Sequence, residues 1–229
     1  MKPQEENMKS FVLLYSGGAD STVAFHMLTQ EGHTVYPLYI DYGQKALRNE
    51  IKAAKFFIEK FKSPPLKIIK TDVYKNIINP VLNCNEAANL NSMRNDSETV
   101  SKNFLYFRNL MFATIASIYS KEVRCKDIVF GFIKKNTFVF FPDTSPEFID
   151  KMNNLMKVID PSSSVELMAP CISMEKKNVV GYGIRNDIPM ENTYSCYEIE
   201  CCYKCESCIE VRNAYEQLQL ENLSTGVGW

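Results

Sequence analysis

The chain has almost no net charge and no long apolar run, and each absence excludes a class of function. Its 229 residues include 26 Lys and Arg against 27 Asp and Glu, with a net charge of −1. Domains that bind nucleic acid are usually strongly basic, so DNA or RNA is not expected as the main partner. No stretch has the roughly 18 to 20 apolar residues that cross a bilayer, and residues 1–10 lack the apolar centre of a signal peptide. We therefore expect a soluble cytoplasmic protein with no membrane partner.

Internal repeats, low-complexity tracts and a complete dinucleotide fingerprint are also missing. Gly181 and Gly183 lack the third glycine and the preceding strand of that fingerprint, so a turn or helix end is expected there. The length and 45% hydrophobic content suit one large domain with a small appendage. Apolar segments at residues 11–15, 34–40, 66–70, 127–133 and 165–168 alternate with helix-like segments. This alternation predicts an α/β fold with a parallel sheet.

Three connecting segments are interpreted without a catalytic role. Residues 44–62 have apolar side chains at helical spacing and predict a packed surface helix. Residues 109–120 are apolar on all sides, which predicts a more deeply buried helix. Residues 79–103 are rich in Asn, Ser, Glu and Asp and predict a long surface loop or a partly ordered lid.

The most informative segment, residues 11–22, reads Phe-Val-Leu-Leu-Tyr-Ser-Gly-Gly-Ala-Asp-Ser-Thr. An apolar strand stops at Gly17 and Gly18, where the missing Cβ lets backbone N–H groups approach an anion. Asp20 and Ser21 fall in the first turn of the following helix, where they can meet a phosphate or its magnesium. No Gly-Lys-Ser/Thr follows, so the segment departs from a Walker loop. It predicts a phosphate-binding loop, the alternative being a strand-to-helix turn built for geometry alone.

Five of the eight cysteines lie within residues 196–208. The spacing Cys196-x5-Cys202-x2-Cys205-x2-Cys208 offers four thiolates to one tetrahedral zinc ion, a closed and therefore structural site. Cys201 competes with Cys202 for one position. Cys202 is preferred because the two Cys-x2-Cys steps that share Cys205 then keep an even register. A disulfide pair and an iron–sulfur or redox site are the alternatives.

The segment Ser-Gly-Gly-x-Asp-Ser resembles the pyrophosphate loop of N-type ATP pyrophosphatases. Together with the four cysteines, the chain resembles the 7-cyano-7-deazaguanine synthases, the QueC family, over nearly its whole length. The further matches are Asp41-Tyr42-Gly43-Gln44, Arg108-Asn109, Pro142-Asp143 followed by Glu147-Phe148, Lys176, and Ser195-Cys196-Tyr197. The resemblance implies a Rossmann-like sheet domain of the adenine nucleotide alpha hydrolase type over residues 1–190. A zinc-binding segment, residues 191–229, is expected to pack on it.

The resemblance also implies a reaction. ATP would adenylate 7-carboxy-7-deazaguanine, ammonia would give the amide, and a second adenylation would give the nitrile for queuosine-type biosynthesis. The expected catalytic residues are Asp20, which would also help bind Mg²⁺, with Lys176 and Arg108; for the latter two, surface ion pairing is the alternative. ATP-binding residues are expected at Tyr15, Ser16, Gly17, Gly18, Ala19, Asp20, Ser21, Thr22, Asp41, Tyr42, Gly43 and Gln44. Substrate-binding residues are expected at Arg108, Asn109, Gly131, Pro142 and Asp143, and a homodimer is the implied assembly.

The sequence departs from the family pattern mainly at residues 131–144. An acidic position has become Lys134 and Lys135, and Thr144 replaces a cysteine. A protein amine is therefore an alternative acceptor, as in a QueC-like antiphage-defence enzyme that joins the deazaguanine to a protein. Another tRNA-modifying ATP pyrophosphatase and a non-enzymatic nucleotide binder complete the alternatives.

Overall fold

The computed structural model describes residues 8–77, 79, 81–82, 103–134, 141–161 and 165–225. Most of the predicted lid at residues 79–103, and residues 135–140 of the divergent loop, lie outside the described residues. The strands are β1 (Ser10–Leu14), β2 (Thr34–Asp41), β3 (Lys67–Lys70), β4 (Asp127–Val129) and β5 (Glu166–Met168). The α-helices are α1 (Ala19–Gln30), α2 (Leu47–Phe61), α3 (Arg108–Glu122), α4 (Pro146–Ile159), α5 (Lys176–Arg185) and α6 (Glu206–Thr225), and two 3₁₀ turns are η3 (Pro142–Thr144) and η4 (Met190–Asn192).

The five strands form one parallel sheet in the order β3-β2-β1-β4-β5. Phe11 of β1 lies opposite Val35 of β2 on one side and Asp127 of β4 on the other. The strand order reverses beside β1, and in such sheets ligands bind at the carboxyl ends next to the reversal. The predicted α/β fold with a parallel, Rossmann-like sheet is confirmed.

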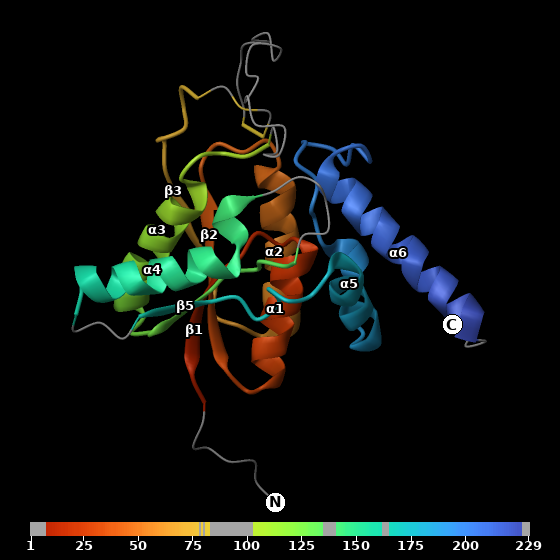
Figure 1. The fold of residues 1–229 in the computed structure, drawn as a ribbon, viewed down its shortest axis with the longest axis horizontal. Helices are drawn as coiled ribbons and strands as arrows, with labels where there is room; N and C mark the ends of the chain where they lie inside the picture. The colour runs from red at the N-terminus through yellow and green to blue at the C-terminus, as the bar shows by residue number, and fades with distance from the viewer. Residues whose placement is uncertain are drawn as a thin grey trace, which may run out of the picture.

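Helices cover both faces of this sheet, which Figure 1 shows nearly edge-on. Phe11 and Leu13 of β1 pack into a core shared with α1, α2 and α5. Val12 points the other way and packs into a core shared with α3 and α4. Successive strand side chains alternate between faces, so the continuous apolar run of β1 fills both cores at once. Helix α6 lies outside α5, on the side of the molecule opposite α4 (Figure 1).

Helix α3 differs from the prediction of deep burial. Ala113 and Ala116 are fully buried against the sheet, whereas Ile118 is 69% exposed. Small side chains on the inner face bring the helix close to the strands. Leu110, Phe112 and Ile115 pack partly against the same core, and Ile118 is left facing outward. Helix α2 lies within the predicted range, and Lys62, the left-handed residue that follows it, stands two positions before Pro64.

Strand β4 is shorter than the predicted segment 127–133. Phe130 still donates its N–H to the Met168 carbonyl at 2.9 Å, but the chain then turns toward α1. A Cβ on Gly131 would lie 2.8 Å from Ser21 Cα, so only glycine permits this approach. The carboxyl end of β4 is thereby brought against the predicted phosphate loop.

Gly181 and Gly183 lie inside α5, so the predicted turn or helix end is wrong. Their role is close packing: a Cβ on Gly183 would overlap the Met190 side chain, and one on Gly181 would lie 3.3 Å from Leu218 Cδ2 of α6. The glycines therefore let η4 and α6 approach the helix closely, and this need overrides the low helix propensity of glycine.

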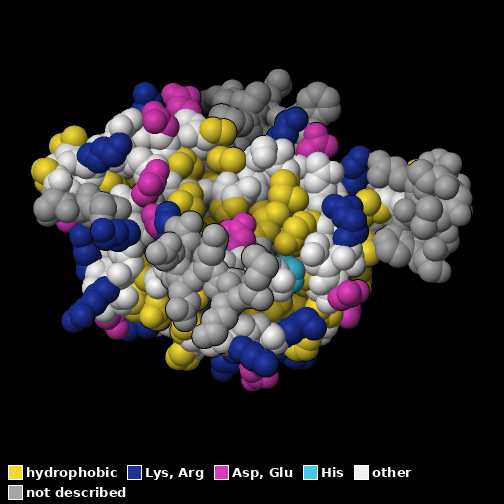
Figure 2. All heavy atoms as spheres, turned by 90° about the horizontal axis from the view of Figure 1, so that it is seen from below, with side chains coloured by type: hydrophobic (Ala, Val, Ile, Leu, Met, Phe, Trp, Pro, Cys, Tyr) yellow, Lys and Arg dark blue, Asp and Glu magenta, His cyan; other side chains and the backbone are white. Residues whose placement is uncertain are grey.

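No helix in the described part of the chain combines the length and the apolarity that a membrane span requires. The charged side chains on the face in Figure 2 are of both signs, and neither sign gathers into a single patch. This mixture agrees with the near-zero net charge of the sequence.

Candidate functional site

The predicted phosphate loop connects β1 to α1. Gly17 has φ +76°, a left-handed conformation that favours glycine, and Gly18 is the N-cap of α1 with extended φ and ψ. The Gly18 N–H donates to Ser16 Oγ at 3.3 Å, and Ser21 Oγ donates to the Gly18 carbonyl at 3.2 Å. The first N–H groups of a helix have no acceptor within it, so the loop places donors where an anion can be held.

A distant segment holds this loop in place. The Tyr194 N–H donates to the Gly17 carbonyl at 3.0 Å, and the Ala19 N–H donates to Ser195 Oγ at 3.2 Å. Beneath the loop, the Tyr15 and Thr22 hydroxyls share a buried hydrogen bond of 3.1 Å. The loop is therefore fixed by hydrogen bonds made before any ligand binds, which reduces the entropy lost on binding.

Lys176 begins α5 and forms an ion pair with Asp20 of α1. Its Nζ donates to Asp20 Oδ1 at 2.6 Å and Oδ2 at 2.7 Å, and the two side chains are 10% and 24% exposed. The alternative of a surface ion pair does not describe this lysine, because it is almost completely buried. The pair places one cation and one carboxylate beside the phosphate loop.

A cavity of about 280 Å³ opens beside the loop at the carboxyl ends of the strands. The predicted site residues that line it are Tyr15, Ser16, Gly18, Asp20, Ser21, Tyr42, Gln44, Arg108, Asn109, Gly131 and Lys176. Further lining residues, which were not predicted, are Leu14, Leu38, Tyr39, Ile40, Glu50, Phe112, Phe130, Phe132, Tyr194, Ser195, Tyr197, Ser207 and Glu210. Residues from both halves of the chain thus meet in one cavity.

The remaining predicted residues lie around the cavity without lining it. Gly17, Ala19 and Thr22 support the loop through the contacts given above. Asp41 Oδ1 accepts the Gly43 N–H at 3.1 Å and thereby shapes the turn after β2. Pro142 is exposed and opens η3. These residues build the site, and their predicted contacts with a ligand stay predictions.

Arg108 and Asn109 begin α3, at one wall of the cavity. The Arg108 guanidinium lies 6.0 Å from the centre of the Tyr42 ring, and its Nε is buried without a hydrogen-bond partner among the described residues. Asn109 Nδ2 donates to the Asp143 carbonyl at 3.1 Å. Burial raises the pKa of the Asp143 carboxyl, whereas the charge of Arg108 lowers it. A buried N–H donor without a partner, such as Arg108 Nε, is typical of a group that hydrogen-bonds to a bound ligand.

Three side chains form a hydrogen-bonded network on the neighbouring wall. Glu50 Oε2 accepts from Tyr39 Oη at 2.5 Å and from Gln44 Nε2 at 3.3 Å, and Gln44 Nε2 also donates to Tyr39 Oη at 2.6 Å. Burial raises the pKa of Glu50, opposed by these donors and by the charge of Arg108. No sequence signal singles out Glu50, because a glutamate on an amphipathic helix normally faces solvent.

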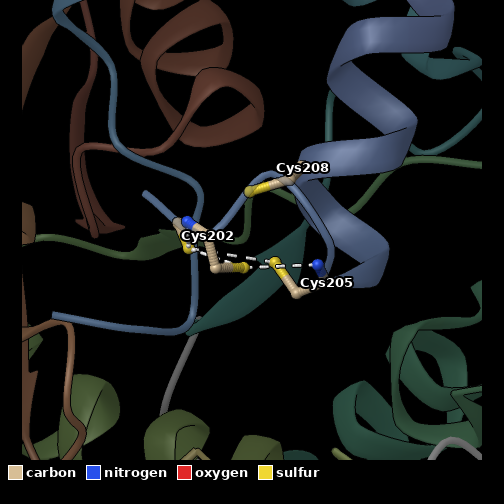
Figure 3. A group of neighbouring side chains, drawn as sticks. Cys202, Cys205 and Cys208 are labelled. Atoms are coloured by element: carbon tan, nitrogen blue, oxygen red, sulfur yellow. Dashed lines mark hydrogen bonds between the residues drawn. The ribbon is translucent and has the colours of Figure 1, made fainter. Parts of the chain in front are cut away.

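The four predicted metal ligands come together beyond this wall. Figure 3 shows Cys202 and Cys205 on the loop before α6 and Cys208 in its first turn, with their sulfur atoms close to one another. The thiols of Cys196, Cys202, Cys205 and Cys208 all lie within 4.8 Å of one another. The structure therefore forms one group of four thiols that can hold a metal ion.

The geometry of this group fits a tetrahedral ion. Zn–S bonds near 2.3 Å imply sulfur atoms about 3.8 Å apart, and Cys196 Sγ lies 3.5 Å from Cys202 Sγ and 4.0 Å from Cys205 Sγ. Backbone N–H groups of residues 204 and 205 donate to Cys202 and lower its pKa to about 6. Burial, together with the neighbouring thiols, raises the pKa of Cys208, an effect that a bound cation would reverse. Cys201 is exposed, with its Sγ 3.8 Å from Cys208 Sγ.

Comparison with known proteins agrees with this arrangement. The profile of the family described as "Queuosine biosynthesis protein QueC" matches residues 10–219. A "7-cyano-7-deazaguanine synthase" from Methanothrix thermoacetophila is 32% identical over 209 residues, covering 89% of this chain and 92% of the relative. A protein of the same name from Methanobrevibacter smithii is 30% identical over 226 residues, covering 94% and 97%.

A solved structure supports the fold alone. The U34-tRNA thiolase NcsA from Methanococcus maripaludis superposes with a TM-score of 0.53 at 18% identity, covering 97% of this chain and 69% of that one. The family profile extends over most of the chain, from β1 into α6, and includes the phosphate loop, the start of α3, Lys176 and the four cysteines. The chain belongs to the QueC family.

Proposed function

We propose that this chain uses ATP to adenylate the carboxylate of 7-carboxy-7-deazaguanine and converts the product, through an amide, to 7-cyano-7-deazaguanine. The observation that carries the proposal is the single cavity in which the phosphate loop and Lys176 meet Arg108 and Asn109. One end suits a triphosphate and the other suits an anionic planar base. The names of the family relatives supply the choice of base.

Each residue type has a task in the first step. The substrate carboxylate attacks the α-phosphorus of ATP, the bond to the β-phosphate oxygen breaks, and pyrophosphate leaves. The N–H groups of Asp20 and Ser21 at the start of α1, with the Ser16 and Ser21 hydroxyls, hold the departing phosphates, and Lys176 offsets the charge that develops on them. Arg108, with its unsatisfied Nε, binds the substrate carboxylate and directs it toward the phosphorus.

The second half of the reaction needs an amine. Ammonia attacks the acyl-adenylate carbonyl, AMP leaves, and the proton released on amide formation passes to solvent. A second ATP then adenylates the amide oxygen, and loss of AMP with a proton leaves the nitrile. Both halves use the same phosphate loop, so no nucleophilic side chain is required and positioning supplies much of the rate.

Two metal ions fit the residues present. Asp20, with the Ser16 and Ser21 hydroxyls near it, offers the hard oxygen ligands that Mg²⁺ prefers. Magnesium would neutralise the phosphates, and Lys176 would then exchange its contact with Asp20 for a phosphate. The group Cys196, Cys202, Cys205 and Cys208 suits structural Zn²⁺, which would join the start of α6 to the preceding loop. The homodimer, the cytoplasmic location and the division at residue 190 stay predictions.

The test is a reaction with defined products. The purified protein is incubated with ATP, magnesium, 7-carboxy-7-deazaguanine and ammonium, and AMP, amide and nitrile are quantified by mass spectrometry. AMP and nitrile formation supports the proposal. AMP without nitrile would retain the adenylation but overturn ammonia as the acceptor, and a protein amine would be sought next. No substrate-dependent AMP would overturn the reaction.

A matched pair of variants links the chemistry to the loop. Asp20→Ala should lose about 100-fold or more in the rate of AMP formation, since it removes the carboxylate at the phosphate site. Asp150→Ala changes an exposed carboxylate on α4, across the sheet from α1, and should keep the wild-type rate. Equal rates in the two variants would remove Asp20 from the mechanism.

A further inference from the structure

Glu50 is a cavity-lining carboxylate for which the adenylation chemistry above has no use. It lies in the first turn of α2, near the carboxyl end of β2. Tyr39 and Gln44 both donate to its Oε2. No hydrogen bond from the described residues reaches its Oε1, which is left as an acceptor for a ligand. A carboxylate accepts hydrogen bonds only, so the missing partner must be an N–H or O–H donor.

The network around Glu50 keeps this acceptor in one orientation. The two N–H groups of Gln44 Nε2 are shared among Tyr39 Oη, Glu50 Oε2 and the Ile40 carbonyl, which lies 3.2 Å away. Gln44 Oε1 accepts the Tyr42 N–H at 2.9 Å. The carboxamide is thereby tied to the backbone at the end of β2, and the Glu50 carboxylate is tied to the carboxamide. A group held this firmly is suited to recognising a ligand, because little side-chain entropy is lost when the ligand binds.

The charges near Glu50 match the donor and acceptor groups of a 7-deazaguanine ring better than those of adenine. Around a 7-deazaguanine ring, the 7-substituent is followed in order by O6, N1–H and the 2-amino group. The first two accept hydrogen bonds or carry negative charge, and the last two donate. Arg108 is near enough to Glu50 for its charge to lower the pKa of that carboxyl. Adenine presents a donor only at N6 and an acceptor at N1, which a carboxylate would repel.

We infer that Glu50 is the specificity-determining residue that accepts N1–H and the 2-amino group of the substrate base. Arg108 then faces the O6 and carboxylate side, and the aromatic wall of Phe112, Phe130 and Phe132 contacts the ring. This inference rests on the proposed function for the identity of the base. It adds a recognition role for a residue on α2, a helix that the sequence marks only as packing.

Equilibrium binding tests the inference without turnover. The probes are 7-carboxy-7-deazaguanine and the same base without its 2-amino group, titrated into the full chain saturated with a non-hydrolysable α,β-methylene analogue of ATP. Losing one charge-assisted hydrogen bond weakens binding about 10- to 100-fold. We expect the wild type to prefer the base with the 2-amino group by that factor. Wild-type binding of both bases within about threefold would overturn the inference, whatever any variant does.

The variant Glu50→Gln keeps the side-chain shape but turns one acceptor into a donor. Its preference for the 2-amino group should fall to about twofold or less, while the affinity for the ATP analogue is unchanged. Glu122→Gln, at the far end of α3 and paired with Lys67, is the matched control and should keep the full preference. A Glu50→Gln variant that folds and keeps the wild-type preference would also overturn the inference, because a merely structural Glu50 would not change ligand selectivity.

The inference and the proposed function fail in different ways. Dependence on the 2-amino group without substrate-dependent AMP would leave Glu50 as a base-reading residue and overturn the reaction. AMP formation without that dependence would keep the reaction and overturn the role of Glu50. Absence of binding by either base would overturn both.

Discussion

Replacing Gly17 by alanine is expected to damage the phosphate loop more than its backbone angle alone suggests. A left-handed residue other than glycine costs about 1–2 kcal/mol. The Cβ of alanine would in addition lie 2.6 Å from the Ala54 nitrogen and 2.8 Å from the Glu50 carbonyl oxygen, both backbone atoms of α2. Backbone atoms cannot rotate away, and such overpacking costs about 1–3 kcal/mol more. The sum is about 2–5 kcal/mol of unfolding free energy.

Gly32 provides a matched control for the backbone angle. Its φ is +82°, and a Cβ there would meet no atom within 4 Å, so Gly32→Ala should cost only the first 1–2 kcal/mol, roughly. At about 2–4 °C per kcal/mol for a chain of this size, Gly17→Ala should lower Tm by about 4–20 °C and Gly32→Ala by about 2–8 °C. Urea unfolding followed by circular dichroism gives the free energies, and titration of ATP gives its affinity, which only Gly17→Ala should weaken. Equal destabilisation by the two substitutions would refute the proposed contact between the loop and α2.

Three further predictions concern other parts of the molecule. Lys176→Met should lower the rate of AMP formation about 100-fold, measured by AMP release, because it removes the cation beside Asp20; a rate within threefold of wild type would contradict this. Metal analysis should find about one zinc per wild-type chain and loss of zinc in Cys202→Ala but not in Cys201→Ala; equal loss would show that neither ligand is preferred. Burial raises the folded-state pKa of Asp127 above its ordinary value of 3.8, so the folded chain binds that proton more tightly than the unfolded chain. The stability of the wild type relative to Asp127→Asn should therefore fall as the pH rises above 3.8, and urea midpoints at pH 4 and pH 7 that differ equally in both proteins would contradict the sign.

Strands and helices of this fold were predictable where the pattern is local. The apolar run of β1 and the helical spacing of α2 predict the correct elements. A strand buried on both faces is apolar at every position, whereas a helix buried on one face is apolar only at every third or fourth position. The depth of α3 was not predictable, since it depends on which neighbours stand opposite Ile118. Gly181 and Gly183 misled for a similar reason. Their place inside α5 is set by the approach of Met190 and α6, which no short-range rule contains.

The site residues likewise fall into those that a local motif predicts and those whose role depends on distant parts of the chain. The phosphate loop is one continuous segment, so its residue types indicate its chemistry directly, and the four cysteines have the short spacing that is typical of structural zinc sites. Glu50 was not predictable, because its role depends on Tyr39 and Gln44 folding around it at the end of β2. Ser195 stood in a recognised motif beside a cysteine, but its hydrogen bond to Ala19 spans 176 positions of sequence.

That last bond changes what counts as the smallest working unit of the chain. A shortened protein that ended at residue 190 would retain the whole strand, loop and helix that resemble a nucleotide site. It would lose the Tyr194 and Ser195 contacts that hold Gly17 and Ala19 in place. We expect such a fragment to bind ATP weakly even if it folds, since the loop would have to order itself at each binding event. Transplanting this nucleotide site into another protein would therefore require a piece from each end of the chain.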